Sequence, residues 1–401
     1  MPFRTFLRKW LVMPSSGQHW DVLDGLRGVA ILMVLFAHGL FVNPEGSLST
    51  QWLGAFFKTG ATGVQVFFVL SGFLISQPFI KARSSDSGSS YVKGYFTRRV
   101  LKILPPFYFT ILLLSAYYYW RYHDMEYVKT GLKWAVGIPH LFFVPHGFNG
   151  VFWSLWVEVG FYTLLPLLFW ALRGRTMWQT GAIIAAILLV VPFVGRWLVI
   201  GQGLEQATLL GQREYLSGRL PNALTNFSWG VLFACLFTAS RRNIGSMRSY
   251  ARIGYAGVGL MALTLTLAAR AQVLGSVNEW GMRELLFHLV GFSTFLMLFF
   301  LFDANSTGTR FFSTPVLRYL GLISYELFLL HQPALNEFRT WMGSAHGEIG
   351  RYLLIVLLPM AASLAAASLL YHWYSTPIIK WGRNRLDRAR AVEAQRPALP
   401  H

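Results

Sequence analysis

The stretch DGLRGVAILMVLFAHG, residues 24–39, is a long apolar run with an arginine near its start and a histidine near its end. Arg27 and His38 lie eleven residues apart, which on an α-helix makes three turns plus about 20°. Both side chains therefore share one helix face, separated by roughly 16 Å along the axis, about half of a bilayer core. Ionisable groups inside a membrane are costly and usually serve chemistry or transport. We favour that interpretation over the structural alternative, an arginine that snorkels to the interface and a packed histidine.

The composition is typical of a polytopic membrane protein. Of the 401 residues, 54% are hydrophobic and 13% are charged, whereas soluble proteins carry about 25% charged residues. The net charge of +18 is compatible with nucleic-acid binding. The basic residues, however, lie at alternate ends of the apolar segments, so we expect no nucleic-acid partner. The single cysteine, Cys235, lies in an apolar run and predicts no disulfide framework.

The apolar runs predict an all-α fold, a polytopic transmembrane helix bundle of about ten spans with both termini in the cytoplasm. The expected spans cover residues 23–42, 63–80, 100–120, 151–172, 178–200, 224–239, 253–269, 285–302, 317–334 and 352–374. Residues 135–146 are apolar but too few to span, so we expect a re-entrant or interfacial segment there. The predicted organisation is a cytoplasmic N-terminal segment at 1–20, a transmembrane domain at 21–376 and a basic cytoplasmic tail at 377–401.

Lysine and arginine clusters set the predicted orientation. The strongest clusters lie at residues 98–102, 241–252 and 380–396. The ten expected spans place all three on the side of the N-terminus, which is the pattern of the positive-inside rule. The same basic excess favours attraction to anionic membrane lipids.

Two of the expected spans carry polar side chains. Ser154, Glu158 and Tyr162 recur at intervals of four residues and form a stripe on one helix face. A carboxylate within a span is a strong functional signal, and a structural ion pair is its alternative. In the span at 63–80, the buried amide of Gln65 needs partners. The glycines of that span are explained by close helix packing.

Span 317–334 and the start of span 100–120 carry further candidates. Ser324 and His331 lie seven residues apart on one face, and His331 is near the expected outer end. Arg99 and Lys102 share a face at the cytoplasmic end of the third span. With Arg98 they either hold the topology or clamp a phosphate-bearing cosubstrate.

Other motifs narrow the chemistry. The pair Pro105 and Pro106 is expected to break the third span and to leave backbone groups that need partners. The sequence contains no metal-ligand spacing, no Walker-type loop and no G-x-S-x-G motif. We therefore expect no metal and no nucleotide-hydrolysis mechanism.

Five motifs together resemble the integral-membrane acyltransferase-3 family, whose members O-acylate sugars, polysaccharides, lipopolysaccharide and macrolides. The motifs are LDGLRGVAILMVLFAH, FFVLSGFLIS, RRVLKILPPFY, WSLWVEVGFYTLLP and ISYELFLLHQP. The family's Arg–ten residues–His pattern falls on Arg27 and His38. Its basic pair falls on Arg99 and Lys102, with lysine in place of the second arginine. Many relatives have an acidic residue where this chain has Gln65.

The resemblance implies an O-acyltransferase of the bacterial cytoplasmic (inner) membrane, with 21–376 as its acyltransferase domain. Acyl-CoA, most simply acetyl-CoA, would be the cosubstrate, its phosphates held by Arg98, Arg99 and Lys102. The acceptor would be a carbohydrate, a lipid-linked glycan or a glycosylated small molecule. We predict catalytic roles for His38 as general base, Glu158 as its orienting partner and Arg27 at the CoA end or paired with Asp24. The predicted substrate-binding residues are Gln65, Ser71, Trp153, Ser154, Tyr162, Ser324 and His331.

Other functions remain open at this point. Ten helices with His, Glu and Gln in the membrane also suit a transporter or flippase of a small polar or lipid-linked solute. A non-catalytic acceptor-binding partner is a third hypothesis. Within the acyltransferase hypothesis, direct transfer and a route through an acyl-His38 intermediate are both compatible with the sequence.

Overall fold

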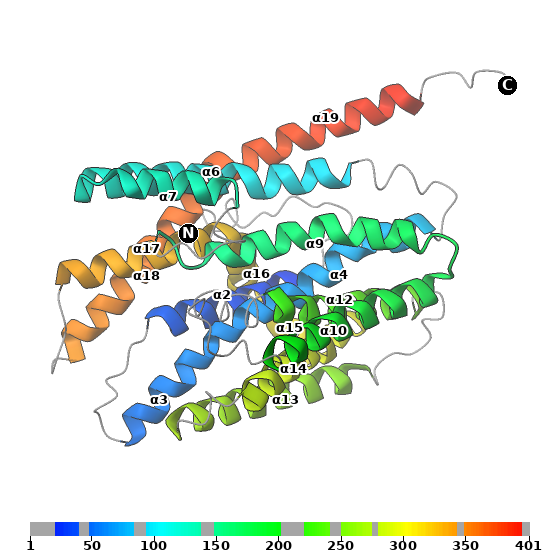
Figure 1. Ribbon diagram of the computed structural model, residues 1–401, viewed down its shortest axis with the longest axis horizontal. Coiled ribbons are helices and arrows are strands. Elements are labelled where there is room, and N and C mark those ends of the chain that lie inside the picture. Colours follow the sequence, from blue (N-terminus) through cyan, green and yellow to red (C-terminus); the bar gives the residue numbers. More distant parts are fainter. Residues whose placement is uncertain are drawn as a thin grey trace.

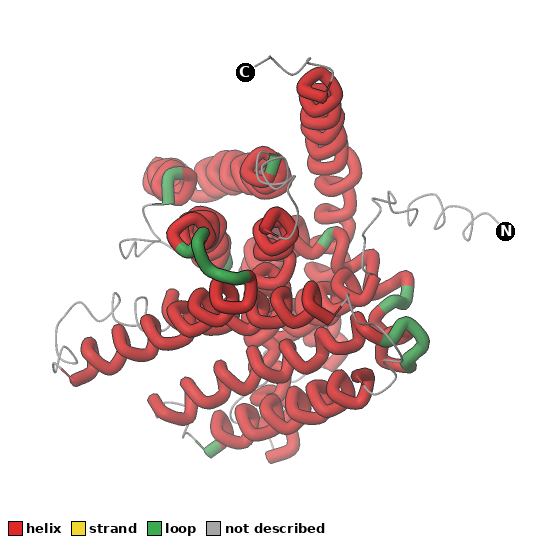
Figure 2. Tube along the Cα trace, turned by 90° about the vertical axis from the view of Figure 1, so that its right-hand side faces the viewer, coloured by secondary structure: helices red, strands yellow, loops and turns green. Residues whose placement is uncertain are grey.

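Every regular element that the structure describes is a helix, which confirms the all-α prediction (Figure 1; Figure 2). The computed structural model describes residues 21–39, 48–83, 94–137, 148–201, 220–240, 250–274, 280–342 and 349–394. Most of the expected interfacial segment at 135–146, and all of the N-terminal segment at 1–20, lie outside the described residues.

Seven helical segments of the described residues are long and apolar enough to cross a membrane, so the chain is an integral membrane protein. They are Asp21–Gly39, Gln51–Ile80, Tyr95–Tyr122, Phe152–Ala171, Tyr250–Val273, Leu285–Phe302 and Val356–Arg388. Two shorter apolar helices, Met177–Val191 and Ala223–Ala239, fall where further spans are expected. That the chain has ten spans stays a prediction.

Five helices build the part of the molecule that matters for function. They are α2 (Asp21–Gly39), α4 (Gly63–Arg83), α6 (Tyr95–Tyr122), α9 (Phe152–Ala171) and α17 (Ser324–Met342). Helix α2 packs against both α4 and α17, while α9 lies on α4 and α6 contacts α17. Segments from both ends of the chain therefore meet around α2 (Figure 1).

The other elements surround these five. They are α3 (Leu48–Lys58), η1 (Thr59–Thr62), α7 (Met125–Ala135), α10 (Met177–Gly201), α12 (Leu220–Ser240), α13 (Tyr250–Val273), α14 (Trp280–Met297), η5 (Leu298–Phe302), α15 (Thr307–Phe312), α16 (Pro315–Leu322), α18 (Ile349–Leu370), η6 (Tyr371–Ser375) and α19 (Thr376–Ala394). Helix α18 continues through the π-helical turn η6 into α19, which packs along α6.

The expected single span at 317–334 is wrong, because the chain forms two helices that meet at Ile323. The hydroxyl of Ser324 donates to the carbonyl of Gly321 at 2.7 Å, a local bond that competes with continued helix. A Cβ on Gly321 would lie 1.8 Å from the carbonyl oxygen of Asp24, so α16 approaches α2 backbone to backbone. This break lets the first turn of α17 face the interior beside α2.

The expected break at Pro105 and Pro106 is also wrong, since α6 is continuous from Tyr95 to Tyr122. The two prolines remove the donors that the carbonyls of Leu101 and Lys102 would have within the helix, and membrane helices tolerate such turns where surrounding protein contacts them. Here the phenol of Tyr325, on α17, donates to the carbonyl of Ile103 at 2.8 Å. The proline turn is therefore fixed against α17.

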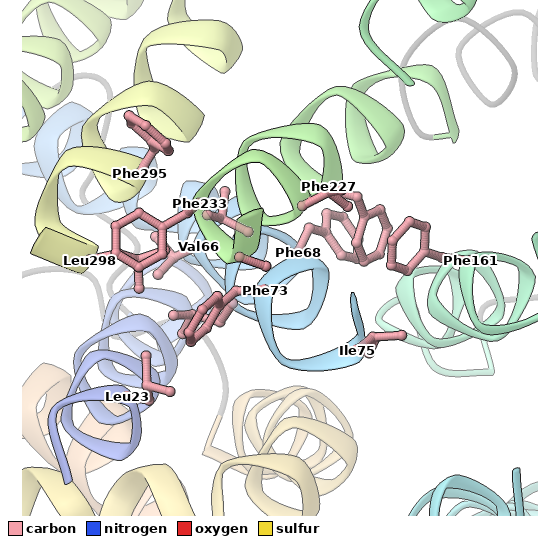
Figure 3. Packing of buried hydrophobic residues seen from close by; sticks show 14 of the residues in the cluster. Leu23, Val66, Phe68, Phe73, Ile75, Phe161, Phe227, Phe233, Phe295 and Leu298 are labelled. Carbon is pink, nitrogen blue, oxygen red and sulfur yellow. The ribbon is translucent and has the colours of Figure 1, made fainter. Parts of the chain in front are cut away.

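Aromatic side chains fill the core between α4, α9 and α12 (Figure 3). The rings of Phe161 and Phe227 are stacked, with centroids 3.9 Å apart, and Phe68 packs on Phe227 at 5.0 Å. A Cβ on Gly72 of α4 would lie 2.3 Å from the carbonyl oxygen of Phe227, so only glycine fits there. This confirms close packing as the reason for the glycines of span 63–80. Such contacts hold membrane helices together because lipid offers no hydrophobic driving force between them.

Candidate active site

One interior cavity gathers most of the polar residues that the sequence singles out. Its walls come from α2, α4, α6, α9 and α17. The predicted site residues that line it are Arg27, Ser71, Arg99, Lys102, Ser154, Glu158, Tyr162 and Ser324. The apolar lining includes Phe67, Phe68, Tyr325 and Phe328. The break before Ser324 is what brings the start of α17 to this wall.

Glu158 is the main acceptor in the cavity. Its Oε1 accepts a hydrogen bond from the hydroxyl of Ser71 at 2.6 Å and another from the phenol of Tyr162. The guanidinium of Arg99 lies over the ring of Tyr162, 5.6 Å from its centroid. The predicted stripe on α9 is therefore confirmed as one polar surface, joined to α4 and α6.

Three cations, Arg27, Arg99 and Lys102, also line the cavity. Lys102 lies within electrostatic range of Arg27 and Arg99, and of the acidic residues Asp24 and Glu326. The guanidinium carbon of Arg27 is 5.9 Å from the ring centroid of Phe67. Its buried Nε has no hydrogen-bond partner among the described residues. The cavity thus offers a buried donor to whatever enters it.

His38 does not line this cavity; it lies against His331 of α17. Nδ1 of His38 is 3.0 Å from Nε2 of His331, and the ring centroids are 5.1 Å apart. His331 is fully buried, whereas His38 is partly exposed. Arg339 donates to the backbone carbonyl of His38 and, at 3.3 Å, to that of Gly39. The end of α2 is therefore held by α17.

The contacts of His331 determine the tautomers of the pair. Nδ1 of His331 lies 3.1 Å and 2.9 Å from the carbonyl oxygens of Leu327 and Phe328, which can only accept. This nitrogen therefore carries a hydrogen. Because burying a charged ring is costly, His331 is neutral and its Nε2 accepts. Nδ1 of His38 must then donate, so Nε2 is the ring nitrogen of His38 that carries the lone pair.

An aromatic wall separates the cavity from the histidine pair. The rings of Phe67 and Phe328, which both line the cavity, meet edge to face with centroids 6.4 Å apart. On its other side Phe328 lies 5.7 Å, ring to ring, from His331. The cavity and the pair are therefore neighbours that share Phe328.

A basic groove lies between α6 and α19. Arg98, Arg99, Lys102 and Arg383 contribute four cations to its lining. Arg99 and Lys102 line both this groove and the interior cavity. The two spaces consequently meet at the predicted basic pair.

One predicted contact is wrong, and two predicted substrate-binding residues besides His331 lie outside the cavity. The predicted pairing of Glu158 with His38 is wrong, because the ring partner of His38 is His331 and Glu158 bonds to α4 and α9. Gln65 is buried outside the cavity, and its Oε1 has no hydrogen-bond partner among the described residues. Trp153 packs edge-on against Phe68.

Three residues of the site escaped the sequence analysis, namely Tyr325, Phe328 and Arg339. Arg383 belongs to the predicted basic cluster at 380–396, but its place beside Arg98 and Arg99 was not predicted. Phe328 follows the predicted site residue Ser324 by four residues and Tyr325 by three, and this helical spacing is the only local signal for Tyr325 and Phe328. The described residues contain no group of three or more His, Cys, Asp or Glu side chains that could ligate a metal ion.

Comparison with known proteins identifies a family and relatives of this chain. A family model described as an acyltransferase domain, Acyl_transf_3, matches residues 20–372. O-acetyltransferase OatA of Staphylococcus aureus strain NCTC 8325 / PS 47 is 24% identical over 397 residues, covering 92% of this chain and 58% of the relative. A putative O-acetyltransferase of S. aureus strain COL is 23% identical over 381 residues, covering 91% of this chain and 58% of that relative. No solved structure matches.

The family model covers nearly the whole chain, so the chain belongs to the acyltransferase-3 family of membrane enzymes. It spans less than two thirds of the length of the curated relatives that it matches.

Proposed function

We propose that this protein is an O-acetyltransferase of the bacterial inner membrane. It moves an acetyl group from acetyl-CoA to a hydroxyl group of a carbohydrate, a lipid-linked glycan or a glycosylated small molecule. One observation carries the proposal: helices α2 and α17 hold both a cation-lined cavity and a histidine whose Nε2 is free to take a proton. Acyl transfer from CoA needs a site for an anionic cosubstrate and a base for the acceptor.

The donor binds at the cationic end. The groove between α6 and α19 presents arginines that suit phosphate groups, and arginine binds phosphate through paired N–H bonds. The shared residues Arg99 and Lys102 lead from this groove to the cavity, where the buried guanidinium of Arg27 lies. From the positive-inside rule we expect this end on the cytoplasmic side, where acetyl-CoA is available.

The base lies next to the cavity, beyond the ring of Phe328. Nε2 of His38 takes the proton of the acceptor hydroxyl while the hydroxyl oxygen attacks the thioester carbonyl. A C–O bond forms and the C–S bond breaks. The CoA thiolate leaves and receives the same proton from His38, which returns to its neutral form. Throughout, His331 accepts from Nδ1 of His38 and holds its ring.

Glu158 takes a different part from the one the sequence suggests. Its carboxylate is bound by two hydroxyls and faces the cations of the cavity. It therefore shapes and balances the donor cavity and does not act on the proton of His38.

The decisive experiment measures transfer with the purified protein in nanodiscs. Radiolabelled acetyl-CoA is supplied with acceptor glycans extracted from the producing strain, and labelled glycans are identified by mass spectrometry. We expect an increase of one acetyl mass on a sugar hydroxyl. Uptake of glycan into proteoliposomes with no acetyl transfer would instead support a transporter.

A further inference from the structure

Another groove lies between α6 and α17, at the end of α6 away from Arg99 and Lys102, and has the chemistry of a sugar-binding site. Its lining residues are Tyr117, Trp120 and Arg121 of α6 with Glu337, Phe338 and Trp341 of α17. None of them is among the residues that the sequence singles out. Helix α6 rises roughly 22 Å over the fifteen residues from Lys102 to Tyr117, so most of a bilayer core separates this groove from the basic pair Arg99 and Lys102.

The groove combines flat aromatic faces with a fixed carboxylate. Trp120 and Trp341 are 69% and 82% exposed. Between the two helices, the phenol of Tyr117 donates to Oε2 of Glu337 at 2.9 Å. Pyranose rings pack their C–H faces on aromatic rings, and their hydroxyls bond to carboxylate and guanidinium groups. An interfacial aromatic belt accounts for exposed tryptophans. It does not account for a carboxylate held between two helices.

The position of the groove ties it to His38. Glu337 lies about 9 Å farther along α17 than His331. In the same turn of α17, Arg339 donates to the backbone carbonyl of His38. One turn of α17 thus carries both Glu337, which lines the groove, and Arg339, which holds the end of α2 that bears His38.

We propose that this groove, which we call the aromatic groove, binds a pyranose unit of the acceptor glycan. The inference rests on the proposed function for its place in the reaction. It extends that function by giving the acceptor a site of its own, across the membrane from the donor. The sugar stacks on Trp341 and Trp120, and Glu337 accepts hydrogen bonds from its hydroxyls.

Binding is tested without any transfer. Saturation-transfer NMR of the nanodisc-embedded protein uses methyl glycosides of glucose, galactose and N-acetylglucosamine as probes. We expect contact signals with at least one glycoside. Trp341→Ala and Glu337→Gln should weaken its binding about tenfold or more. Trp170→Ala, which removes a tryptophan at the end of α9 that is 66% exposed, should not. All variants are first checked for monodispersity, and Trp341→Phe, which keeps an aromatic face, should restore much of the binding.

The outcomes separate the two proposals. If Trp341→Ala and Trp170→Ala behave alike, or if only association with anionic vesicles changes, the groove is a lipid-facing belt and the inference is overturned. If glycosides bind in the groove but no acetyl leaves acetyl-CoA, the sugar site stands and the proposed function fails. With an active enzyme, Trp341→Ala should raise KM for the glycan by about tenfold.

Discussion

The cation-lined cavity and the histidine pair lie on the same two helices, α2 and α17, but they are built differently. The cavity takes its polar side chains from five helices, and its charges lie among hydroxyls and aromatic rings. The histidine pair needs only α2 and α17, and backbone carbonyls of α17 fix the ring of His331. The first arrangement suits the binding of a large charged molecule, and the second suits the control of a single proton. Phe67 and Phe328 keep them apart.

The largest expected effect is on the proton side. His38→Ala should lower turnover by about 10²–10⁴-fold, the usual contribution of a general base. Assembly and membrane insertion should be normal. The matched control is His123→Asn, which removes an exposed imidazole at a position with φ of 53° that asparagine tolerates. Steady-state transfer in nanodiscs makes the measurement. Turnover within about tenfold of the parent protein would show that His38 is not the base.

The second-largest effect is expected for substitutions of His331, and these show whether His331 positions His38 or contacts the substrate. His331→Leu removes the acceptor for Nδ1–H of His38 and should lower kcat by about 10²-fold with little change in either KM. His331→Gln keeps an acceptor oxygen in that place and should recover much of the loss. If KM for the acceptor rises and the leucine and glutamine variants are equally impaired, His331 binds the substrate, as the sequence predicts.

A smaller effect is expected on the cavity side. The double change of Arg99 and Lys102 to glutamine should raise KM for acetyl-CoA by about tenfold, or about 1.4 kcal/mol. It should also flatten the dependence of that KM on salt, because a phosphate clamp is electrostatic. Arg173→Gln with Arg175→Gln removes two exposed arginines after α9 and serves as the control. An unchanged KM in the first double variant would leave Arg99 and Lys102 with a role in topology alone.

Local sequence patterns predicted what depends on one helix at a time. The stripe of Ser154, Glu158 and Tyr162 follows from helix periodicity and lines the cavity as expected. Arg27 and His38 lie on one continuous helix, as predicted, but only Arg27 lines the cavity. The contact between His38 and His331 joins residues 293 positions apart and depends on how α17 lies against α2. No spacing rule contains that information.

The same limit explains the two incorrect helix boundaries. Pro105 and Pro106 signal a break by local rules, but Tyr325 of α17 contacts that turn and the helix continues. Residues 317–334 read as one apolar span, but Gly321 packs on the backbone of Asp24 and the chain bends after it. In both places a tertiary contact outweighs the local propensity. The aromatic groove also depends on two separate helices, and no local pattern singles out its residues.

The last and smallest effect tests whether the two regions act independently. Glu158→Gln keeps an oxygen that can accept from Ser71 and Tyr162, so it should fold and lose only a few-fold in activity, mainly as a higher KM for acetyl-CoA. Combined with His331→Leu, its loss in transition-state free energy should add to within about 0.5 kcal/mol, as expected for residues that share no partner. If Glu158 oriented His38, as the sequence predicted, both substitutions would impair the same catalytic unit. The second substitution would then lower kcat/KM hardly further. A double-mutant cycle on kcat/KM measures the difference. Strong non-additivity would mean that the aromatic wall of Phe67 and Phe328 does not separate the cavity from the base during turnover.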